Sequence, residues 1–285
     1  VTVIEIHREF YLLLVQRENT SLSKLEQNYI KEKIIYLLER WWRTGEIYLE
    51  KPTIRDERAN ILYYLNKVFP TVLERSDQQI KSSWIEMGFN PNKIKNPGFF
   101  PKINFGSWVG GDRDGHPLVT PGITEETLLL HRNTALYLIK NQLLNLVTKL
   151  SVSAFSNPIP FLLVEAIEKK SKVLGEPGEI AIKRNPYEHW RQYVSLLLVQ
   201  LENTISEKHS DSNSYYKSST VLEEDLELLR EILIENGIKG IAEDLLFPIE
   251  RAVRCFGFHL AKLDIRQNSA FHDKAISQIL KHNGV

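Results

Sequence analysis

The sequence FGSWVGGDRDGHP, residues 105–117, joins a short extended run to a turn that is rich in glycine and charge. The run 102–108 leads directly into the pair Gly110-Gly111. Glycine lets the backbone take a positive φ or approach a ligand closely. Three charged residues follow the pair: Asp112, Arg113 and Asp114. We therefore expect this turn to hold charged side chains at the mouth of a site.

Most of the sequence on either side of this turn is typical of helices, because apolar residues recur at helical spacing. The expected helices cover residues 4–19, 25–43, 124–150, 185–204 and 220–236, with another opening at 51–53 and a short one ending at Gly257. Thr124 and Thr220 are the expected N-caps of two of them. Stretches rich in proline, glycine or serine predict loops at 88–101, 151–160 and 206–220.

Residues 258–266 change the period from helical spacing to alternation, which predicts a buried strand. The alternation places Lys262, Asp264 and Arg266 on one side of that strand. A buried strand that ends in charged residues commonly presents a site at its C-terminal end. The planar fork of an arginine there suits a phosphate or carboxylate. The expected fold class is mostly α, with these few strands.

The composition narrows the class of protein. The chain has 285 residues, of which 42% are hydrophobic and 25% charged, a balance typical of globular proteins. This length allows one large domain or two smaller ones, and we expect a single unit. Lysine and arginine together number 36, as do aspartate and glutamate together. The chain therefore lacks the basic excess that is typical of nucleic-acid-binding proteins. No membrane-spanning stretch or signal peptide is evident. Cys255 is the only cysteine, which excludes an intrachain disulfide and suits a reducing, cytoplasmic setting, and we expect it to be packed.

Other interpretations of the glycine-rich turn are weaker or stay open. A P-loop is excluded, because His116-Pro117 stand where it needs lysine followed by serine or threonine. An EF-hand loop is excluded, because the residues at its ligand positions are not ligands here. The eight histidines show no metal-ligand spacing, so we expect no metal site. The segment 112–115 could be a solvated turn, Trp108 could pack in the core, and Arg266 could pair with Asp264.

The segment 105–120 closely resembles the FGSW-x-GGDRDG-NP-x-VT signature of bacterial- and plant-type phosphoenolpyruvate carboxylases. Residues 263–269, LDIRQNS, resemble the later LD-(I/V)-RQ-(E/D)-S segment of that family. Weaker similarity appears at 42–47 and 51–53 to a W-x-T-(D/N)-E-I … KPT block, and at 185–187 to an E-PYR block. Three positions depart from the family pattern: His116, Glu188 and Asn268.

This resemblance implies an enzyme, a carbon–carbon lyase that converts phosphoenolpyruvate and bicarbonate to oxaloacetate and phosphate. It implies that Arg266 binds the substrate phosphate and that Trp108 forms a wall of an apolar pocket for carbon dioxide. These two are the expected catalytic residues. Asp112, Arg113 and Asp114 are expected to shape the substrate site. A divalent metal, Mg²⁺ or Mn²⁺, and a tetrameric assembly are implied for the parent enzyme.

The resemblance also implies that the chain is an internal fragment which contributes strands to an α/β, TIM-like barrel. The family's TAHPTE segment, which carries its catalytic histidine, does not occur in the 285 residues, nor do its arginine-rich loop and metal-binding carboxylates. We therefore expect the isolated chain to be inactive. Two alternatives remain from other classes of protein: a non-catalytic helical interaction module, and a module that binds metabolites without converting them.

Overall fold

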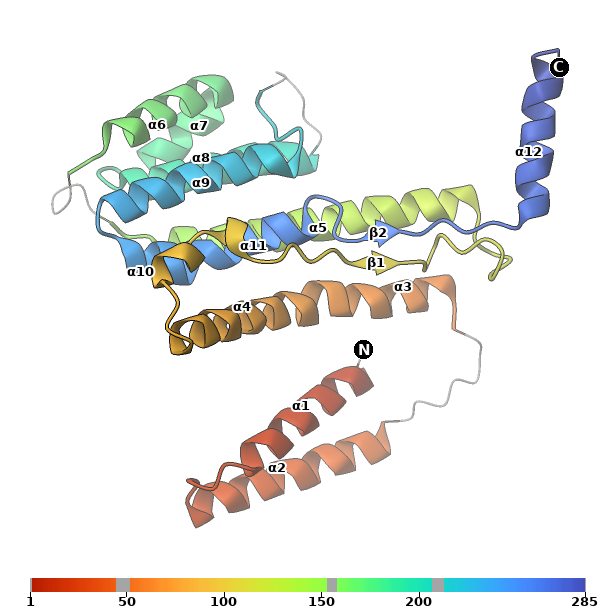
Figure 1. The fold of residues 1–285 in the computed structure, drawn as a ribbon, viewed down its shortest axis with the longest axis horizontal. Helices are drawn as coiled ribbons and strands as arrows, with labels where there is room; N and C mark the ends of the chain where they lie inside the picture. Colours follow the sequence, from red (N-terminus) through yellow and green to blue (C-terminus); the bar gives the residue numbers. More distant parts are fainter. Residues whose placement is uncertain (1, 45–51, 153–157, 207–212, 285) are drawn as a thin grey trace. The chain divides into compact units, whose positions relative to one another are not determined.

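The computed structural model describes residues 2–44, 52–152, 158–206 and 213–284 of the chain (Figure 1). The described residues are mostly helical, as the sequence predicts. Although we expected a single unit, the contacts group into two, Val1–Tyr63 and Tyr64–Val285. No described helix has the length and apolar character that crossing a bilayer requires.

The first unit contains α1 (Thr2–Arg17), α2 (Lys24–Arg43) and α3 (Ile54–Tyr63). Ser23 begins α2 with a capping box, since its hydroxyl accepts from the Glu26 amide and the Glu26 carboxylate accepts from the Ser23 amide. α1 and α2 pack together and bury one apolar face of each helix. The buried side chains on these two helices are Val3, Ile6, Ile30, Ile34 and Leu37. The helix break expected at Gly45 lies outside the described residues.

The second unit contains the remaining elements and the functional motifs. Its longer helices are α4 (Phe69–Glu86), α5 (Pro121–Lys149), α6 (Phe161–Leu174), α7 (Glu176–Lys183), α8 (His189–Ser206), α9 (Ser219–Glu235), α11 (Phe247–Phe256) and α12 (Ser269–His282). Short helical turns are η1 (Tyr64–Val68), η2 (Pro91–Ile94), η3 (Pro97–Phe99), α10 (Lys239–Ile241) and η4 (Ala242–Leu246). The strands are β1 (Gly106–Ser107) and β2 (Lys262–Leu263).

The core of this unit lies where α8 packs against α5, α6 and α7, while α9 packs against α11 (Figure 1). α5 contributes a stripe at helical spacing: Leu136, Ile139, Leu143 and Leu146. α8 contributes large side chains that are fully buried, including Trp190 and Tyr193. Cys255 is buried and free, so the expectation that it is packed is confirmed.

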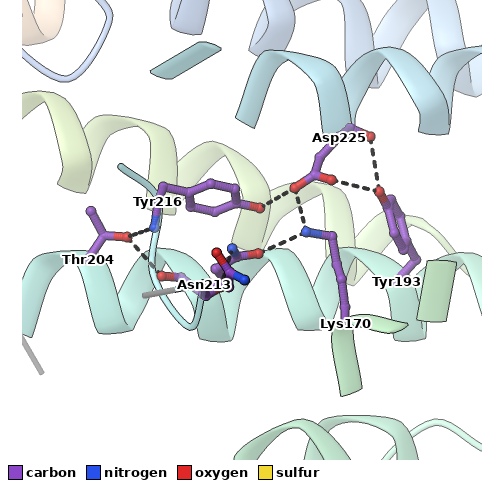
Figure 2. A network of polar contacts seen from close by, with 7 residues as sticks. Lys170, Tyr193, Thr204, Asn213, Tyr216 and Asp225 are labelled. Carbon is purple, nitrogen blue, oxygen red and sulfur yellow. Dashed lines mark hydrogen bonds and ion pairs between the residues drawn. The ribbon is translucent and has the colours of Figure 1, made fainter. Parts of the chain in front are cut away.

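A polar network joins α6, α8 and α9 inside this core (Figure 2). The ammonium of Lys170 lies 2.6 Å from a carboxylate oxygen of Asp225 and 2.8 Å from the amide oxygen of Gln200. The hydroxyls of Tyr193 and Tyr216 donate to the same carboxylate at 3.2 and 2.8 Å. Burial raises the pKa of both tyrosines, and the Asp225 charge raises it further. Both therefore stay protonated and donate, which fixes the three helices together.

Several expected boundaries move, each for a local reason. The long helix begins at Pro121 with Thr120 as its N-cap, not Thr124, because proline is preorganised for the first turn. α9 begins after Ser218 rather than at Thr220. The expected loop 88–101 is confirmed, with two short 3₁₀ turns inside it. In the expected loop 151–160, the described residues 151–152 and 158–160 are non-helical. In the expected loop 206–220, residues 213–218 are non-helical, whereas Ser206 is the last residue of α8 and Ser219 begins α9. The centres of both loops lie outside the described residues.

The strand expected over 258–266 is shorter than the alternation predicts. Gly257 ends α11 with a φ of 54°, and Leu260 has a φ of 61°, so the chain turns before it extends. Phe258, Leu260 and Ala261 are still buried. Only Lys262 and Leu263 form a regular strand, because β1 offers them only two partner residues.

Candidate functional site

Two segments far apart in sequence meet as a parallel pair at the centre of the site. β1 and β2 pair with Gly106 opposite Lys262 and Ser107 opposite Leu263 (Figure 1). The amide of Asp264 donates to the Ser107 carbonyl at 2.8 Å. The parallel register therefore brings the end of the second segment alongside the glycine-rich turn.

Pairing resumes beyond the two strands. An isolated parallel bridge joins Asp112 to Arg266. The Arg266 amide donates to the Gly111 carbonyl, and the Arg113 amide donates to the Arg266 carbonyl, both at 3.0 Å. Gly111 is needed for this approach, because a Cβ there would collide with the carbonyl oxygen of Asp264. The backbone of the turn is thus fixed to the backbone of Arg266 on both sides.

The start of α5 supports the turn from its other side. Gly110 has a φ of 89°, and an added Cβ there would meet the side chain of Thr127. The buried hydroxyl of Thr124 donates to the Gly110 carbonyl at 2.9 Å. The sequence pattern predicted Thr124 as a helix cap, and this supporting role was not expected. Apart from a threonine near a helix start, no signal in one sequence indicates it.

Three stacked rings hold the extended run that precedes β1. Phe105 stacks on Phe69 of α4 with ring centroids 4.8 Å apart, and on Phe256 of α11 with centroids 4.9 Å apart. The planes lie within 14° and 8° of parallel. Phe105 therefore ties the glycine-rich segment to the helix that leads into β2. Neither Phe69 nor Phe256 was expected in this role from the sequence.

The structure brings the side chains of Trp108 and Arg266 together. The guanidinium carbon of Arg266 lies 5.2 Å from the centroid of the Trp108 ring, which is within cation–π range. Trp108 is 53% exposed, so the core-packing alternative for it is wrong. Within the described part of the chain, Arg266 forms no ion pair with Asp264. An indole face and a guanidinium thus lie side by side on an accessible surface.

The three charged residues of the turn have different surroundings. Arg113 is partly buried, and its Nη2 lies 3.5 Å from the hydroxyl of Thr124, while its Nε is buried and has no hydrogen-bond partner among the described residues. Asp112 packs its carboxylate against Gly115. Asp114 is exposed, and the described residues show no contact of its side chain with Trp108 or Arg266. Asp112 and Arg113 therefore belong to the scaffold beneath the Trp108–Arg266 pair.

The departures from the family pattern have local roles. The Nδ1 atom of His116 accepts from the amide of Leu118 at 3.3 Å. Asn268 is the N-cap of α12, where its side chain accepts from the Ala270 amide at 2.9 Å. Glu188 pairs with Arg191 at 2.6 Å, well away from the glycine-rich turn in sequence. None of the three replaces a residue of the Trp108–Arg266 pair.

The described residues do not fit a metal ion. No group of three or more histidine, cysteine, aspartate or glutamate side chains gathers within the described ranges. The nearby carboxylates of Asp112 and Asp114 are not joined by such a third ligand. We therefore assign no chemical step to a metal held by this chain.

The fold and this site define a helical segment that presents an arginine and a tryptophan beside a glycine-rich turn. The family model for phosphoenolpyruvate carboxylase matches residues 1–285, and the chain belongs to that family.

Individual relatives agree with this assignment. A phosphoenolpyruvate carboxylase of Methylorubrum extorquens is 31% identical over 284 residues, which is 99% of this chain and 30% of the relative. One from a Nostoc species is 33% identical over 274 residues, covering 90% of this chain and 25% of the relative. The chain therefore corresponds to less than a third of the length of these curated relatives.

Proposed function

We propose that this chain is the part of a phosphoenolpyruvate carboxylase that holds the substrate phosphate and one wall of the carbon dioxide pocket. The reaction joins phosphoenolpyruvate and bicarbonate to give oxaloacetate and phosphate. The observation that carries the proposal is the placement of the Arg266 guanidinium 5.2 Å from the Trp108 ring, on paired backbone segments. Membership of the family supplies the reaction.

In the first step, an oxygen of bicarbonate attacks phosphorus and the bond from phosphorus to the enol oxygen breaks. Carboxyphosphate and the enolate of pyruvate form. The guanidinium of Arg266 binds the phosphoryl oxygens, because its fork of N–H groups matches them bidentately. Its backbone is held at both its amide and its carbonyl by the glycine-rich turn. These bonds position the backbone of Arg266, and the Trp108 ring lies beside its guanidinium, which favours catalysis by holding the group near one place.

In the second step, carboxyphosphate breaks its bond between carbon and the phosphate oxygen, releasing carbon dioxide and phosphate. The carbanionic carbon of the enolate then attacks carbon dioxide and forms the new carbon–carbon bond. A dry apolar pocket keeps carbon dioxide close and keeps water from protonating the enolate. Trp108 supplies one wall of that pocket, and its 53% exposure is the face that substrate would cover.

Asp112, Arg113 and Asp114 contribute to substrate binding by shaping the turn. Arg113 reaches the Thr124 hydroxyl, which itself holds the Gly110 carbonyl. Asp112 supports the turn at Gly115 and pairs its backbone with Arg266. Asp114 is exposed in the same turn. Asp112 and Arg113 act on the substrate mainly through the position of Trp108 and Arg266.

The complete enzyme supplies what this chain does not contain. The family implies a divalent metal, Mg²⁺ or Mn²⁺, and a catalytic histidine in a TAHPTE segment that is absent from these 285 residues. The isolated chain is accordingly inactive in this proposal. The complete enzyme is a tetramer in the cytoplasm, and β1 and β2 are two strands of its TIM-like barrel.

Exposed apolar side chains support the interpretation as part of a larger enzyme. On α12 no residue is buried, and Phe271, Ile276 and Ile279 are each more than half exposed. Single exposed apolar residues are common, whereas an unburied helix with a row of them marks a surface for contact. Further protein covers such a surface in the complete enzyme.

The experiment uses a phosphoenolpyruvate carboxylase of full family length that carries these 285 residues. Arg266→Ala abolishes turnover, while Glu86→Gln, far from the site in sequence, leaves it unchanged. Trp108→Ala raises the ratio of pyruvate to oxaloacetate formed, because the enolate is protonated when carbon dioxide escapes. Turnover of Arg266→Ala within tenfold of the parent would contradict the phosphate role. An unchanged product ratio in Trp108→Ala would contradict the role of Trp108 in the carbon dioxide pocket. A module that binds metabolites without converting them would then be favoured.

A further inference from the structure

The peptide group that joins Gly110 to Gly111 is held at both of its ends. Its carbonyl oxygen, which belongs to Gly110, accepts from the Thr124 hydroxyl at 2.9 Å. Its N–H, which belongs to Gly111, donates to the Trp108 carbonyl at 2.9 Å. A peptide group is planar and rigid, so a contact that fixes its carbonyl also fixes the direction of its N–H. The Thr124 hydroxyl therefore acts on the main chain of Trp108 through one rigid unit.

The following peptide group connects Trp108 to Arg266 in the same way. The Gly111 carbonyl accepts from the Arg266 amide at 3.0 Å, and the Asp112 amide donates to the Trp108 carbonyl at 3.1 Å. The Trp108 carbonyl thus receives an N–H from each of two successive peptide groups. Thr124 holds the first of these groups and Arg266 holds the second. Together the two contacts set where the backbone of Trp108 lies relative to Arg266.

Backbone preferences alone do not fix the first peptide group, because a glycine lies on each side of it. Gly110 has a φ of 89°, and glycine takes positive and negative φ about equally readily. Both glycines are buried, so a Gly110 carbonyl without a donor is costly. The hydroxyl of Thr124 restrains the rotation of this peptide group and also satisfies its carbonyl.

The surroundings of Thr124 direct its hydroxyl hydrogen toward Gly110. Thr124 is buried, which screens the hydroxyl from water. Nη2 of Arg113 donates to its Oγ1 at 3.5 Å, so the hydroxyl hydrogen is left for an acceptor. The Gly110 carbonyl lies at 2.9 Å and the Thr120 carbonyl at 3.3 Å, and the shorter contact is the stronger one. A hydroxyl that accepts from a guanidinium is also a better donor.

We propose that the Thr124 hydroxyl is a positioning group for the Trp108 indole, and that it thereby limits protonation of the enolate. The second part rests on the proposed function, in which Trp108 forms a wall of the carbon dioxide pocket. Without the hydroxyl, the peptide group rotates and the Trp108 carbonyl loses one N–H donor. The indole is then held less closely and carbon dioxide escapes. The enolate takes a proton from water to give pyruvate, and the hydroxide left over converts the carbon dioxide to bicarbonate.

Binding of the substrate phosphate depends less on Thr124. The Arg266 carbonyl accepts from the Arg113 amide at 3.0 Å, and the strand before Arg266 is paired through the Asp264 amide, which donates to the Ser107 carbonyl at 2.8 Å. Neither contact involves the Thr124 hydroxyl. Loss of that hydroxyl therefore raises the ratio of pyruvate to oxaloacetate, while the KM for phosphoenolpyruvate stays within about twofold of the parent value.

Variants at position 124 form two pairs that differ in the hydroxyl. In a full-length carboxylase that carries these 285 residues, Thr124→Val is compared with the parent, and Thr124→Ala with Thr124→Ser. We expect the hydroxyl-free member of each pair to raise the ratio of pyruvate to oxaloacetate by about fivefold or more, because a buried carbonyl loses its donor. Thr134→Val is the control on the same helix and leaves the ratio unchanged, since the Thr134 hydroxyl donates to the Leu130 carbonyl of α5 itself.

A second measurement follows the indole without catalysis. The same proteins are labelled with fluorotryptophan, and the fluorine resonance of Trp108 is assigned by its absence from Trp108→Phe. We expect Thr124→Val and Thr124→Ala to shift or broaden this resonance, and Thr124→Ser and Thr134→Val to leave it at the parent position. A hydroxyl that only stabilises the start of α5 would lower the melting temperature and leave both the resonance and the product ratio unchanged.

Three results would overturn the proposal. They are an unchanged Trp108 resonance in Thr124→Val, an equal change in Thr124→Ser, and a parental product ratio in Thr124→Val although Trp108→Ala raises that ratio. If Trp108→Ala itself leaves the ratio unchanged, the carbon dioxide role of Trp108 fails. The fluorine resonance then decides the positioning role alone: a shift in Thr124→Val supports it and an unchanged resonance contradicts it. Failure of this proposal and failure of the proposed function are thus distinguished.

Discussion

Replacing Gly111 by alanine tests whether close approach of two backbones builds the site. An ideal Cβ on Gly111 would overlap the carbonyl oxygen of Asp264, and it would also lie 3.2 Å from a side-chain carbon of Leu263. The carbonyl belongs to the backbone that continues β2, so it cannot rotate aside as a long side chain can. The two segments must therefore move apart.

The cost follows from what the separation breaks. Overpacking of a well-packed position costs about 1–3 kcal/mol. Two backbone hydrogen bonds beside Gly111, from the Arg266 amide to Gly111 and from the Arg113 amide to Arg266, contribute about 0.5–1.5 kcal/mol each. We therefore expect Gly111→Ala to lower the free energy of unfolding of the second unit by about 2–6 kcal/mol.

Gly106→Ala is the matched control, because it lies in the paired strand itself. An added Cβ there has its nearest neighbour, the Lys262 carbonyl oxygen, at 3.9 Å, which is an ordinary contact. Its effect on unfolding stays within about 1 kcal/mol. The assay is urea unfolding followed by circular dichroism, with hydrogen exchange of the peptide that contains residues 262–268. Equal stability of the two variants, or unchanged exchange at the Arg266 amide in Gly111→Ala, would show that close backbone approach does not hold the site together.

Two further predictions concern buried charge in the same unit. Burial raises the pKa of Glu250 from 4.5 to about 7, although Arg230 pairs with it at 2.9 Å. Protonation of Glu250 therefore favours the folded state. The free energy of unfolding falls by about 3 kcal/mol as pH rises from below 4.5 to above 7. Thermal melts across that pH range check this prediction. Glu250→Gln reduces the dependence of stability on pH. A parent protein that gains stability with rising pH would contradict the prediction. Asp77→Ala leaves the buried Arg251 unpaired and costs about 3–5 kcal/mol in urea unfolding. Glu39→Ala removes the exposed partner of Arg43 and lowers the free energy of unfolding by less than about 0.5 kcal/mol. Similar losses in Asp77→Ala and Glu39→Ala would show that burial of the ion pair is not the cause.

The sequence predicted those parts of the fold that depend on local periodicity. The helices expected at 4–19 and 25–43 correspond to α1 and α2, and the long stripe from 128 to 150 corresponds to α5. In each, the apolar face is repeated often enough to identify the period. Boundaries were less accurate, because a proline at position 121 outweighs the capping preference of Thr124.

Three elements were not predicted. α6 and α7 are joined at Gly175, whose φ of 62° ends one helix and begins the next, and neither was assigned from the sequence. α12 was also missed, because its cap Asn268 was interpreted through the family motif alone. The strand was overestimated, since alternation at 258–261 reflects a buried turn rather than pairing.

The residues of the site were nominated from the sequence, but their arrangement was not. Trp108 and Arg266 were chosen from a glycine-rich turn, a charged strand end and a resemblance. Their separation of 5.2 Å depends on the register of β1 against β2, which no local pattern contains. The support from Thr124 and from the Phe69–Phe105–Phe256 stack is likewise tertiary. Their roles in binding remain predictions.

The proposed function requires that the guanidinium of Arg266 and the indole of Trp108 face one substrate. A crystal structure of a full-length carboxylase carrying these residues, with a non-reactive phosphoenolpyruvate analogue bound, shows whether they do. We expect the analogue's phosphate within hydrogen-bond distance of the Arg266 guanidinium, with the Trp108 ring covering the adjacent apolar space. A phosphate bound elsewhere, with Arg266 turned to solvent, would rule out the shared site.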